Sequence, residues 1–271
     1  MSDNYTTATL EEIISPFDAR DFVAKAVEKD FPESFELDEL PVKNQGQVSS
    51  CVAHAASELV EYINRWQEGS YVKMSTGYIY GNREYEVNKL SGGYYARLAM
   101  KVLKNQGDCS YDSFPYNVEM PKAEELYNNR DTSIDEEAYK NRITSYYRLN
   151  DNNAVKATLL EKYPVICSIA WGSGSKYNNQ DGMVHFSDKK DGGHCVLLVG
   201  WNEKGWIIQN SWGKTWGNKG RAIIPYDAPI KELWGVTDTY ISGIKLVSPN
   251  KFVQFIRKLV NFIKKLFKKV K

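Results

Sequence analysis

The chain has 271 residues, of which 42% are hydrophobic and 25% charged, a composition typical of a globular protein with a substantial core. Its formal net charge of +1 gives no basis for a nucleic-acid partner, and four cysteines without a CxxC pair argue against a structural zinc site or a disulfide framework. The first residues lack the pattern of a signal peptide, and no apolar run reaches the roughly 18 residues that span a bilayer. We therefore expect a cytoplasmic protein.

The charges are distributed unevenly along the chain. Residues 1–40 contain eleven acidic and three basic residues, whereas residues 251–271 contain eight basic residues and no acidic one. We interpret residues 1–40 as an acidic N-terminal lead segment. Within it, the spacing of apolar residues predicts a short helix over residues 18–31.

Helical spacing dominates the chain up to about residue 107. Apolar residues recur every three or four positions over residues 51–67, 76–89 and 91–107, which predicts three helices. The pattern then changes to short β-branched and aromatic runs separated by turn residues, which favours antiparallel strands. These runs cover residues 143–150, 164–171, 194–201, 205–212 and 220–227. One more helix is predicted over residues 153–163, so a helical lobe precedes a strand-rich lobe.

Cys51 stands where the polar loop KNQGQVSS gives way to the first of these helices. Backbone N–H groups and the helix dipole at such a position favour the thiolate, which is the nucleophilic form of cysteine. A thiolate needs a histidine to accept its proton and return it to the leaving group. His54 follows in the same helix, where a histidine is more often packed or capped, and His185 has no polar context. His194 follows Asp-Gly-Gly at the start of an apolar strand; taken alone, such a histidine is more often structural.

Two amide side chains have a functional and a structural interpretation. Asn210, in IIQNSWGKTWG, follows an apolar strand and either orients an imidazole through its ring N–H or opens a glycine-rich loop. Gln45 precedes Cys51 by six residues and is either an ordinary loop residue or an N–H donor to a developing oxyanion.

Together and in this order, the runs PVKNQGQVSSCVAHA, SGGYY, GGHCVLLVGW and IIQNSWGKTWGNKG resemble the papain-like (C1) cysteine peptidases. The resemblance extends over about residues 41–248. It implies an α+β, two-lobed papain-like fold, with a helical lobe over about residues 41–120 and an antiparallel β-barrel-like lobe over about residues 121–248. The active-site cleft would lie between the lobes.

The resemblance also implies roles for individual residues. Cys51 is the nucleophile and His194 the general base and acid. Asn210 orients His194, while Gln45 and the Cys51 backbone N–H form the oxyanion hole. No metal or cofactor is expected. The expected substrate-binding residues pair with the substrate backbone, line the pocket for the second residue before the scissile bond, or cover the Asn–His pair; they are Gly92, Gly93, Tyr94, Tyr95, Ser168, Gly193 and Trp212.

Several positions depart from the family pattern. Val52 replaces the usual tryptophan after the nucleophile, and His54 replaces a phenylalanine or similar residue. Val48 and Leu90 occupy the positions of a usual disulfide, which indicates a divergent intracellular, microbial or viral member. Secreted members have a long inhibitory pro-region; here we favour a packed N-terminal strap over a short occluding pro-segment.

Residues 249–271 contain apolar residues at helical spacing with basic residues largely opposite, which predicts a basic amphipathic helix. Such a helix binds an anionic membrane surface, docks on a protein partner, or packs on its own domain. The membrane alternative would make the protein peripherally membrane-associated.

The function predicted from these features is a cysteine endopeptidase that cleaves peptide or protein substrates through a thioester. One alternative is an amidase or transferase that uses the same thioester. A second is a catalytically weak binding or scaffold protein with this fold. A third is a membrane-anchored protein in which the C-terminal basic helix carries the activity.

Overall fold

The structure of the chain, a computed structural model, describes residues 14–16, 18–19, 21–26, 30–83, 93–119, 121–189, 191–237 and 244–247. Several predictions lie wholly or partly outside these residues. They are the lead segment over 1–40, the helices over 18–31, 76–89 and 91–107, the position of Leu90, the role of Gly92, and the amphipathic helix over 249–271. None of the described helices is long and apolar enough to cross a membrane.

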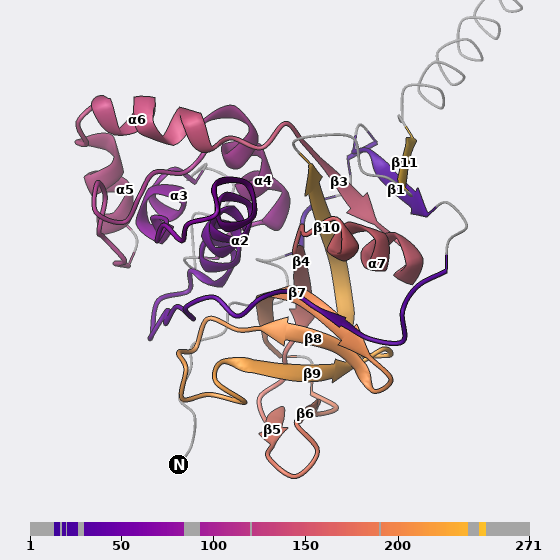
Figure 1. Ribbon diagram of the computed structural model, residues 1–271. Helices are drawn as coiled ribbons and strands as arrows, with labels where there is room; N and C mark the ends of the chain where they lie inside the picture. Colours follow the sequence, from indigo (N-terminus) through magenta and orange to yellow (C-terminus); the bar gives the residue numbers. More distant parts are fainter. Residues whose placement is uncertain are drawn as a thin grey trace, which may run out of the picture.

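The helices between residues 51 and 138 gather on one side of the molecule, around α2 (Figure 1). α2 (Cys51–Glu68) begins at the predicted position, and every residue from Cys51 to Asn64 is buried. It ends at Gly69, whose φ of 74° is readily adopted only by glycine. α3 (Thr76–Gly81) and α4 (Ala96–Asn105) pack against α2 within the two other regions predicted to be helical.

The helical lobe continues beyond these elements. α5 (Lys122–Asn128), α6 (Ser133–Ala138) and the 3-10 helix η2 (Tyr139–Asn141) follow, and α5 packs against α3. Neither α5 nor α6 was predicted, because each buries at most two residues and so lacks a repeated apolar pattern. After η2 the chain continues into β3 (Ser145–Leu149).

The strands form one sheet in the order β11-β1-β3-β10-β4-β7-β8-β9-β6-β5, with β2 paired to β7. Their bounds are β1 (Val23–Ala26), β2 (Phe35–Glu36), β4 (Val165–Ala170), β5 (Lys176–Asn178), β6 (Met183–His185), β7 (Gly193–Asn202), β8 (Gly205–Gln209), β9 (Arg221–Pro225), β10 (Ile230–Thr237) and β11 (Ile244–Val247). The β1–β3 and β6–β9 pairs are parallel and the others antiparallel. In the described part of the chain the sheet is thus mixed and open, whereas the sequence predicted an antiparallel, barrel-like lobe.

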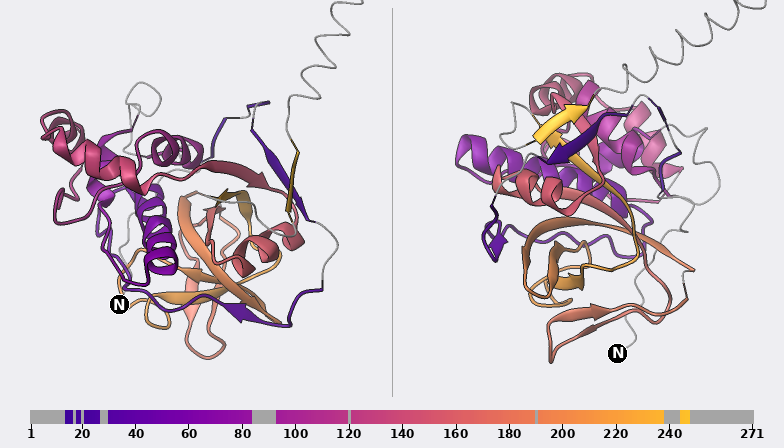
Figure 2. Two further views of the ribbon diagram at one scale, coloured as in Figure 1. Left: turned by 45° about the horizontal axis from the view of Figure 1, so that its top comes forward. Right: turned by 90° about the vertical axis from the view of Figure 1, so that its right-hand side faces the viewer.

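The remaining helix of this lobe, α7 (Asn152–Leu160), lies against β1 and β7 and occupies most of the segment predicted to be helical over residues 153–163. Its first turn is capped by Asp151, whose side chain accepts a hydrogen bond from the backbone N–H of Ala154 at 2.8 Å. Figure 2 shows the helical lobe and the sheet as neighbouring bodies, which confirms the two-lobed α+β architecture.

The helix predicted over residues 18–31 is wrong. Residues 23–26 form β1, which pairs antiparallel with β11 and parallel with β3. Ala24, in the middle of β1, is buried. A helix this short is marginal by itself, whereas a strand between two neighbours satisfies its backbone N–H and C=O groups on both edges. Tertiary pairing therefore overrides the local helical spacing.

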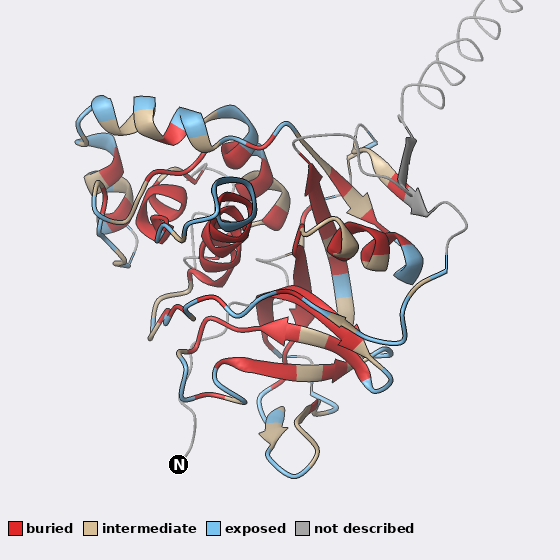
Figure 3. Cartoon of the chain, in the orientation of Figure 1, coloured by how far each residue is buried: buried red, intermediate tan, exposed pale blue. Residues whose placement is uncertain are grey.

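The two lobes share one buried interior, which runs from α2 into β7 and β8 (Figure 3). Arg221 of β9 reinforces this junction with five hydrogen bonds, three of which are 2.8 Å or shorter. Its guanidinium donates to Glu36 Oε1 at 2.6 Å, to the Asp38 carbonyl at 2.7 Å and to Tyr62 Oη of α2 at 2.8 Å. These bonds hold β9, the segment that carries β2 and α2 together.

Candidate active site

Cys51 is the first residue of α2 and is almost completely buried. The preceding loop turns at Gly46, which has a φ of 57°, and reaches the helix through Ser50, whose side chain makes no capping hydrogen bond. The sulfur therefore sits at a helix N-terminus that no acidic residue occupies in its first turn. That position favours a negatively charged sulfur.

The other three cysteines, Cys109, Cys167 and Cys195, are also buried. None of the four forms a disulfide. Burial raises the pKa of the thiols of Cys109, Cys167 and Cys195. After burial, the proximity of Cys51 is the next largest cause that raises the pKa of Cys195. The N-terminus of α2 therefore lies close to β7.

His194 is the second residue of β7 and lies opposite Ile169 of β4. Its Nε2 is 2.7 Å from Asn210 Oδ1, and the same oxygen accepts the Ser211 backbone N–H at 2.8 Å. Because that oxygen is an acceptor, Nε2 carries the ring proton and Nδ1 presents a lone pair. Nδ1 is buried and has no hydrogen-bond partner among the described residues.

Aromatic rings enclose His194. The Trp212 ring stacks on the imidazole with centroids 4.5 Å apart and planes inclined by 22°. Trp171, at the end of β4, meets the imidazole edge-on at 5.4 Å and also contacts Trp212 at 5.2 Å. Burial lowers the pKa of His194 to about 4, whereas the hydrogen bond to Asn210 raises it. Unless a negative charge lies nearby, the imidazole is therefore neutral at pH 7 and able to accept a proton.

Gln45 ties the loop before α2 to the loop after β8. Its backbone N–H donates to the Ser211 carbonyl at 2.8 Å, and its side-chain oxygen accepts from Ser211 Oγ at 2.7 Å. Its Nε2 donates to the Val48 carbonyl at 3.0 Å. A second contact between these loops joins the Gly213 N–H to the Lys43 carbonyl at 2.9 Å. The Gln45 amide is thus fixed in orientation beside the segment that leads to Cys51.

The other predicted site residues in the described part of the chain lie at the start of β7, after β8, on β4 and just before α4. Gly193 begins β7, and Trp212 covers His194. Tyr94 is buried, Tyr95 caps the start of α4, and the Gly93 carbonyl accepts a hydrogen bond from Arg83 at 2.5 Å.

Ser168, in the middle of β4, is buried opposite Cys195 of β7. Its Oγ lies 3.4 Å from Glu232 Oε1 of β10. Glu232 was not predicted to belong to the site. A charged residue within the otherwise apolar run ELWGV is the signal that could have revealed it.

His54 adopts the structural alternative. Its Nδ1 is 3.0 Å from the Ser50 carbonyl oxygen, so it donates a hydrogen bond within its own helix. Burial, followed by the positive charge of Lys43, lowers its pKa to about 3. Trp171 was missed as a neighbour of His194, because a tryptophan at the end of an apolar strand is usually a core residue and its contact depends on tertiary packing.

Residues 31–229 match the sequence model of a family described as papain family cysteine protease. Cathepsin K of Mus musculus is 30% identical over 190 residues, which are 68% of this chain and 55% of that protein, so the chain spans about half the length of this relative. Zingipain-2 of Zingiber officinale is 28% identical over 199 residues, 70% of this chain and 86% of that protein. The crystal structure of xylellain, a cysteine protease from Xylella fastidiosa, has a TM-score of 0.71 at 23% identity and covers 84% of this chain and 95% of its own, a likeness in fold.

Proposed function

Because the chain belongs to the papain family of cysteine proteases, we propose that it is a cysteine endopeptidase that hydrolyses peptide bonds through a thioester acyl-enzyme. The main support for this proposal is the buried hydrogen bond between His194 and Asn210, which leaves the lone pair of His194 Nδ1 available. Trp171 and Trp212 surround the imidazole. The thiol assigned to this base is Cys51, at the N-terminus of α2.

In the first half-reaction the proton of Cys51 passes to His194 Nδ1, and the thiolate attacks the carbonyl carbon of the scissile peptide. The imidazolium keeps its Nε2–H hydrogen bond to Asn210. Negative charge develops on the former carbonyl oxygen, where the Cys51 backbone N–H and Gln45 Nε2 are the assigned donors. His194 then gives its proton to the leaving amine as the C–N bond breaks, and a thioester remains.

In the second half-reaction water attacks the thioester carbonyl. His194 accepts a proton from that water as general base and returns it to the departing sulfur of Cys51, which releases a carboxylic acid. The stacked Trp212 limits solvent access to the Asn210–His194 hydrogen bond, and exclusion of water strengthens that bond.

Labelling with a peptidyl epoxide, which alkylates activated thiolates, tests the assignment. We expect rapid alkylation of Cys51 alone, located by mass spectrometry, because burial raises the pKa of the other three thiols. His194→Ala should slow labelling about a hundredfold, the usual scale of general-base catalysis. His185→Ala is the matched control, since His185 is exposed and pairs with Asp181.

Slow labelling spread over all four cysteines, and unchanged in His194→Ala, would contradict the proposal and leave a binding or scaffold protein as the alternative. If Cys51 is labelled rapidly, products formed from a library of peptides separate an endopeptidase from an amidase or transferase. Internal cleavage with free carboxyl termini is the expected result.

A further inference from the structure

The N-terminal strap, defined here as residues 14–16, 18–19 and 21–24, crosses from one lobe to the other. Ser15 makes the crossing contact. Its Oγ accepts the backbone N–H of Arg97 in α4 at 3.0 Å, while its own N–H and Oγ–H donate to Glu232 Oε1 of β10 at 3.2 and 3.0 Å. The strap is thus attached to both lobes through one buried serine.

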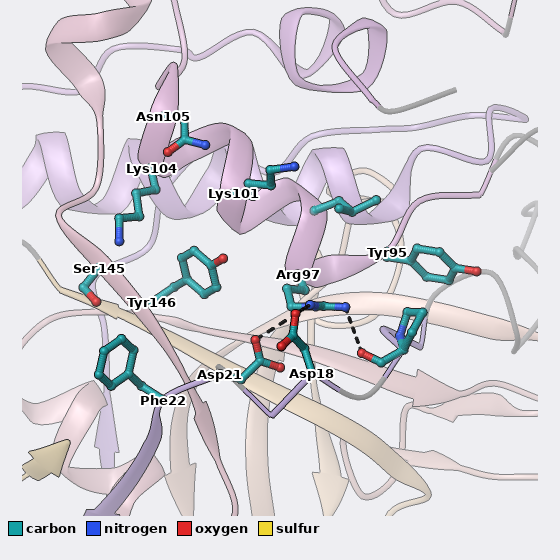
Figure 4. Close-up of a pocket in the computed structure, with 12 residues that line it drawn as sticks. Asp18, Asp21, Phe22, Tyr95, Arg97, Lys101, Lys104, Asn105, Ser145 and Tyr146 are labelled. Carbon is teal, nitrogen blue, oxygen red and sulfur yellow. Dashed lines mark hydrogen bonds and ion pairs between the residues drawn. The ribbon is translucent and has the colours of Figure 1, made fainter. Parts of the chain in front are cut away.

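Two carboxylates of the strap neutralise two arginines of the lobes. Arg97 Nη1 is 2.7 Å from Asp18 Oδ2 and 4.0 Å from Asp21 Oδ1, and Arg97 Nη2 donates to the Pro16 carbonyl at 2.9 Å. Arg148 Nε of β3 is 2.9 Å from Asp21 Oδ2. Figure 4 shows Asp18 and Asp21 beside the Arg97 guanidinium. These side chains are mostly buried, so the ion pairs are better protected from solvent than ordinary surface pairs.

A cavity of about 640 Å³ lies beside these ion pairs, between α4 and β3. Apart from the strap's own carboxylates, the charged residues that line it are all basic: Arg97, Lys101 and Lys104. Tyr95 and Tyr146 contribute aromatic walls (Figure 4). The lobes therefore provide a basic cavity, and the strap supplies its negative charge.

The cavity adjoins the residues expected to hold the substrate before the scissile bond. Tyr95 lines the cavity and is one of the expected pocket residues. Ser168, another of them, contacts Glu232, to which Ser15 is bound. Tyr95 therefore links the expected pocket, for the second residue before the scissile bond, to the cavity that the strap lines.

The charges restrict what can replace the strap. A neutral segment in place of the strap would cover Arg97 without supplying the two carboxylates of Asp18 and Asp21. The Nε of Arg97 already has no hydrogen-bond partner in the described part of the chain. Arg148 would keep Glu232, at 3.1 Å. A mostly buried guanidinium without a counter-charge is strongly unfavourable. Replacement of the strap by a neutral or basic segment is therefore unfavourable in free energy. An acidic segment avoids this penalty because it supplies a counter-charge to Arg97.

We propose that this cavity binds acidic segments of peptide substrates on the N-terminal side of the cleaved bond, and that Asp18 and Asp21 occupy it as an exchangeable internal ligand. The inference rests on the proposed peptidase function, because it locates the acidic residues relative to the scissile bond. Arg97 is the principal specificity-determining residue, and Lys101 and Lys104 extend the positive surface along α4.

The test uses three series of peptides that differ only at the third to fifth residues before the scissile bond. These residues are Asp or Glu in the acidic series, Asn or Gln in the amide series, and Lys in the basic series. We expect kcat/KM to favour the acidic over the amide series by about fivefold or more, on the scale of one ion pair, and to lose this preference at high salt. Asp18→Asn/Asp21→Asn should raise kcat/KM for acidic peptides by weakening the competing strap. Arg97→Gln should abolish the preference, whereas Arg97→Lys should retain part of it.

Lys122→Gln is the matched control, because Lys122 forms an exposed ion pair with Glu125 on α5. A second experiment separates the proposed acidic-peptide site from the proposed peptidase activity. It measures, by fluorescence anisotropy, the binding of a labelled acidic peptide to a Cys51→Ala variant. Arg97-dependent binding without cleavage by the unmodified protein would support this site and contradict the peptidase. A different pair of results would overturn the acidic-peptide site but leave the peptidase proposal intact. These results are rapid epoxide labelling of Cys51, together with equal kcat/KM for acidic and amide peptides in the Asp18→Asn/Asp21→Asn variant.

Discussion

At the scale of single residues, the chemistry depends on how one imidazole is held. His194 is subject to two opposing influences: burial disfavours its charged form, and Asn210 Oδ1 stabilises the ring N–H. A proton on Nδ1 must therefore be shared with a negatively charged sulfur to persist in this enclosure. The hydrogen bond to Asn210 also fixes the tautomer of His194, so that Nε2 carries the proton and Nδ1 is left for the reaction.

Asn210→Ala should lower kcat/KM about ten- to a hundredfold, since a hydrogen bond to a charged group contributes about 1.5–3 kcal/mol. The bond raises the pKa of His194, so its loss makes the imidazolium deprotonate more readily. The alkaline limb of the pH–kcat/KM profile should therefore move to lower pH. Asn129→Ala, on the exposed end of α5, is the control. A profile of unchanged shape would show that Asn210 does not act through His194.

At the scale of elements, α2 combines the candidate nucleophile with acidic side chains in the core. Glu61 pairs with Lys43 Nζ at 2.9 Å, and Glu58 Oε1 accepts the Lys43 backbone N–H at 3.1 Å. Burial, and then the proximity of Glu61, raise the pKa of Glu58 to about 8. The helix that presents Cys51 therefore rests on a polar core whose protonation varies with pH.

Glu58→Gln should reveal this dependence. A carboxyl group with a raised pKa in the folded state stabilises the fold below its unfolded pKa of about 4.5, and that contribution is lost as the pH rises towards about 8. Glutamine resembles the protonated acid at every pH, so the variant should gain several degrees in Tm over the unmodified protein at pH 8 but little at pH 5. Thermal unfolding monitored by circular dichroism across this range measures the difference. Glu136→Gln, a substitution on α6, is the control, and a Tm difference independent of pH would contradict the assignment.

At the scale of the whole molecule, the site depends on the polar contacts that join the two lobes. Arg221 is one of them: it joins β9 to the segment that carries β2 and to Tyr62 of α2. The strap is another, through Ser15 and its bonds to α4 and β10. Contacts distant from Cys51 and His194 therefore help to join the lobes that carry them, in addition to the contact between Gln45 and Ser211.

Arg221→Met keeps the apolar stem of the side chain but removes its hydrogen bonds. It should lower the free energy of unfolding by about 2–4 kcal/mol, because the Tyr62 hydroxyl and two backbone carbonyls lose a charged donor. Urea denaturation measures this change. Arg142→Met, at an exposed arginine that donates to the Tyr139 carbonyl, is the control. Equal stability of the two variants would mean that Arg221 does not hold the lobes together.

Much of this architecture could be predicted from local pattern. The start of α2 at Cys51 and the strands β3, β4, β7, β8 and β9, which coincide with apolar runs, have a periodicity that the sequence displays directly. Short elements could not be predicted in this way. α5 and α6 bury too few residues to show a pattern, and β1 exists because two distant strands pair with it.

The sequence by itself determined which residues are candidates for chemistry, because a cysteine at a helix start, a histidine after Gly-Gly and an asparagine after a strand are local features. Only the tertiary structure decided that His194 Nε2 meets Asn210, that Trp171 adjoins the imidazole, and that Asp18 and Asp21 neutralise arginines of both lobes. Such pairings join residues as far apart in sequence as Asp21 and Arg148. They depend on strand register and on how the lobes pack, which no local periodicity contains.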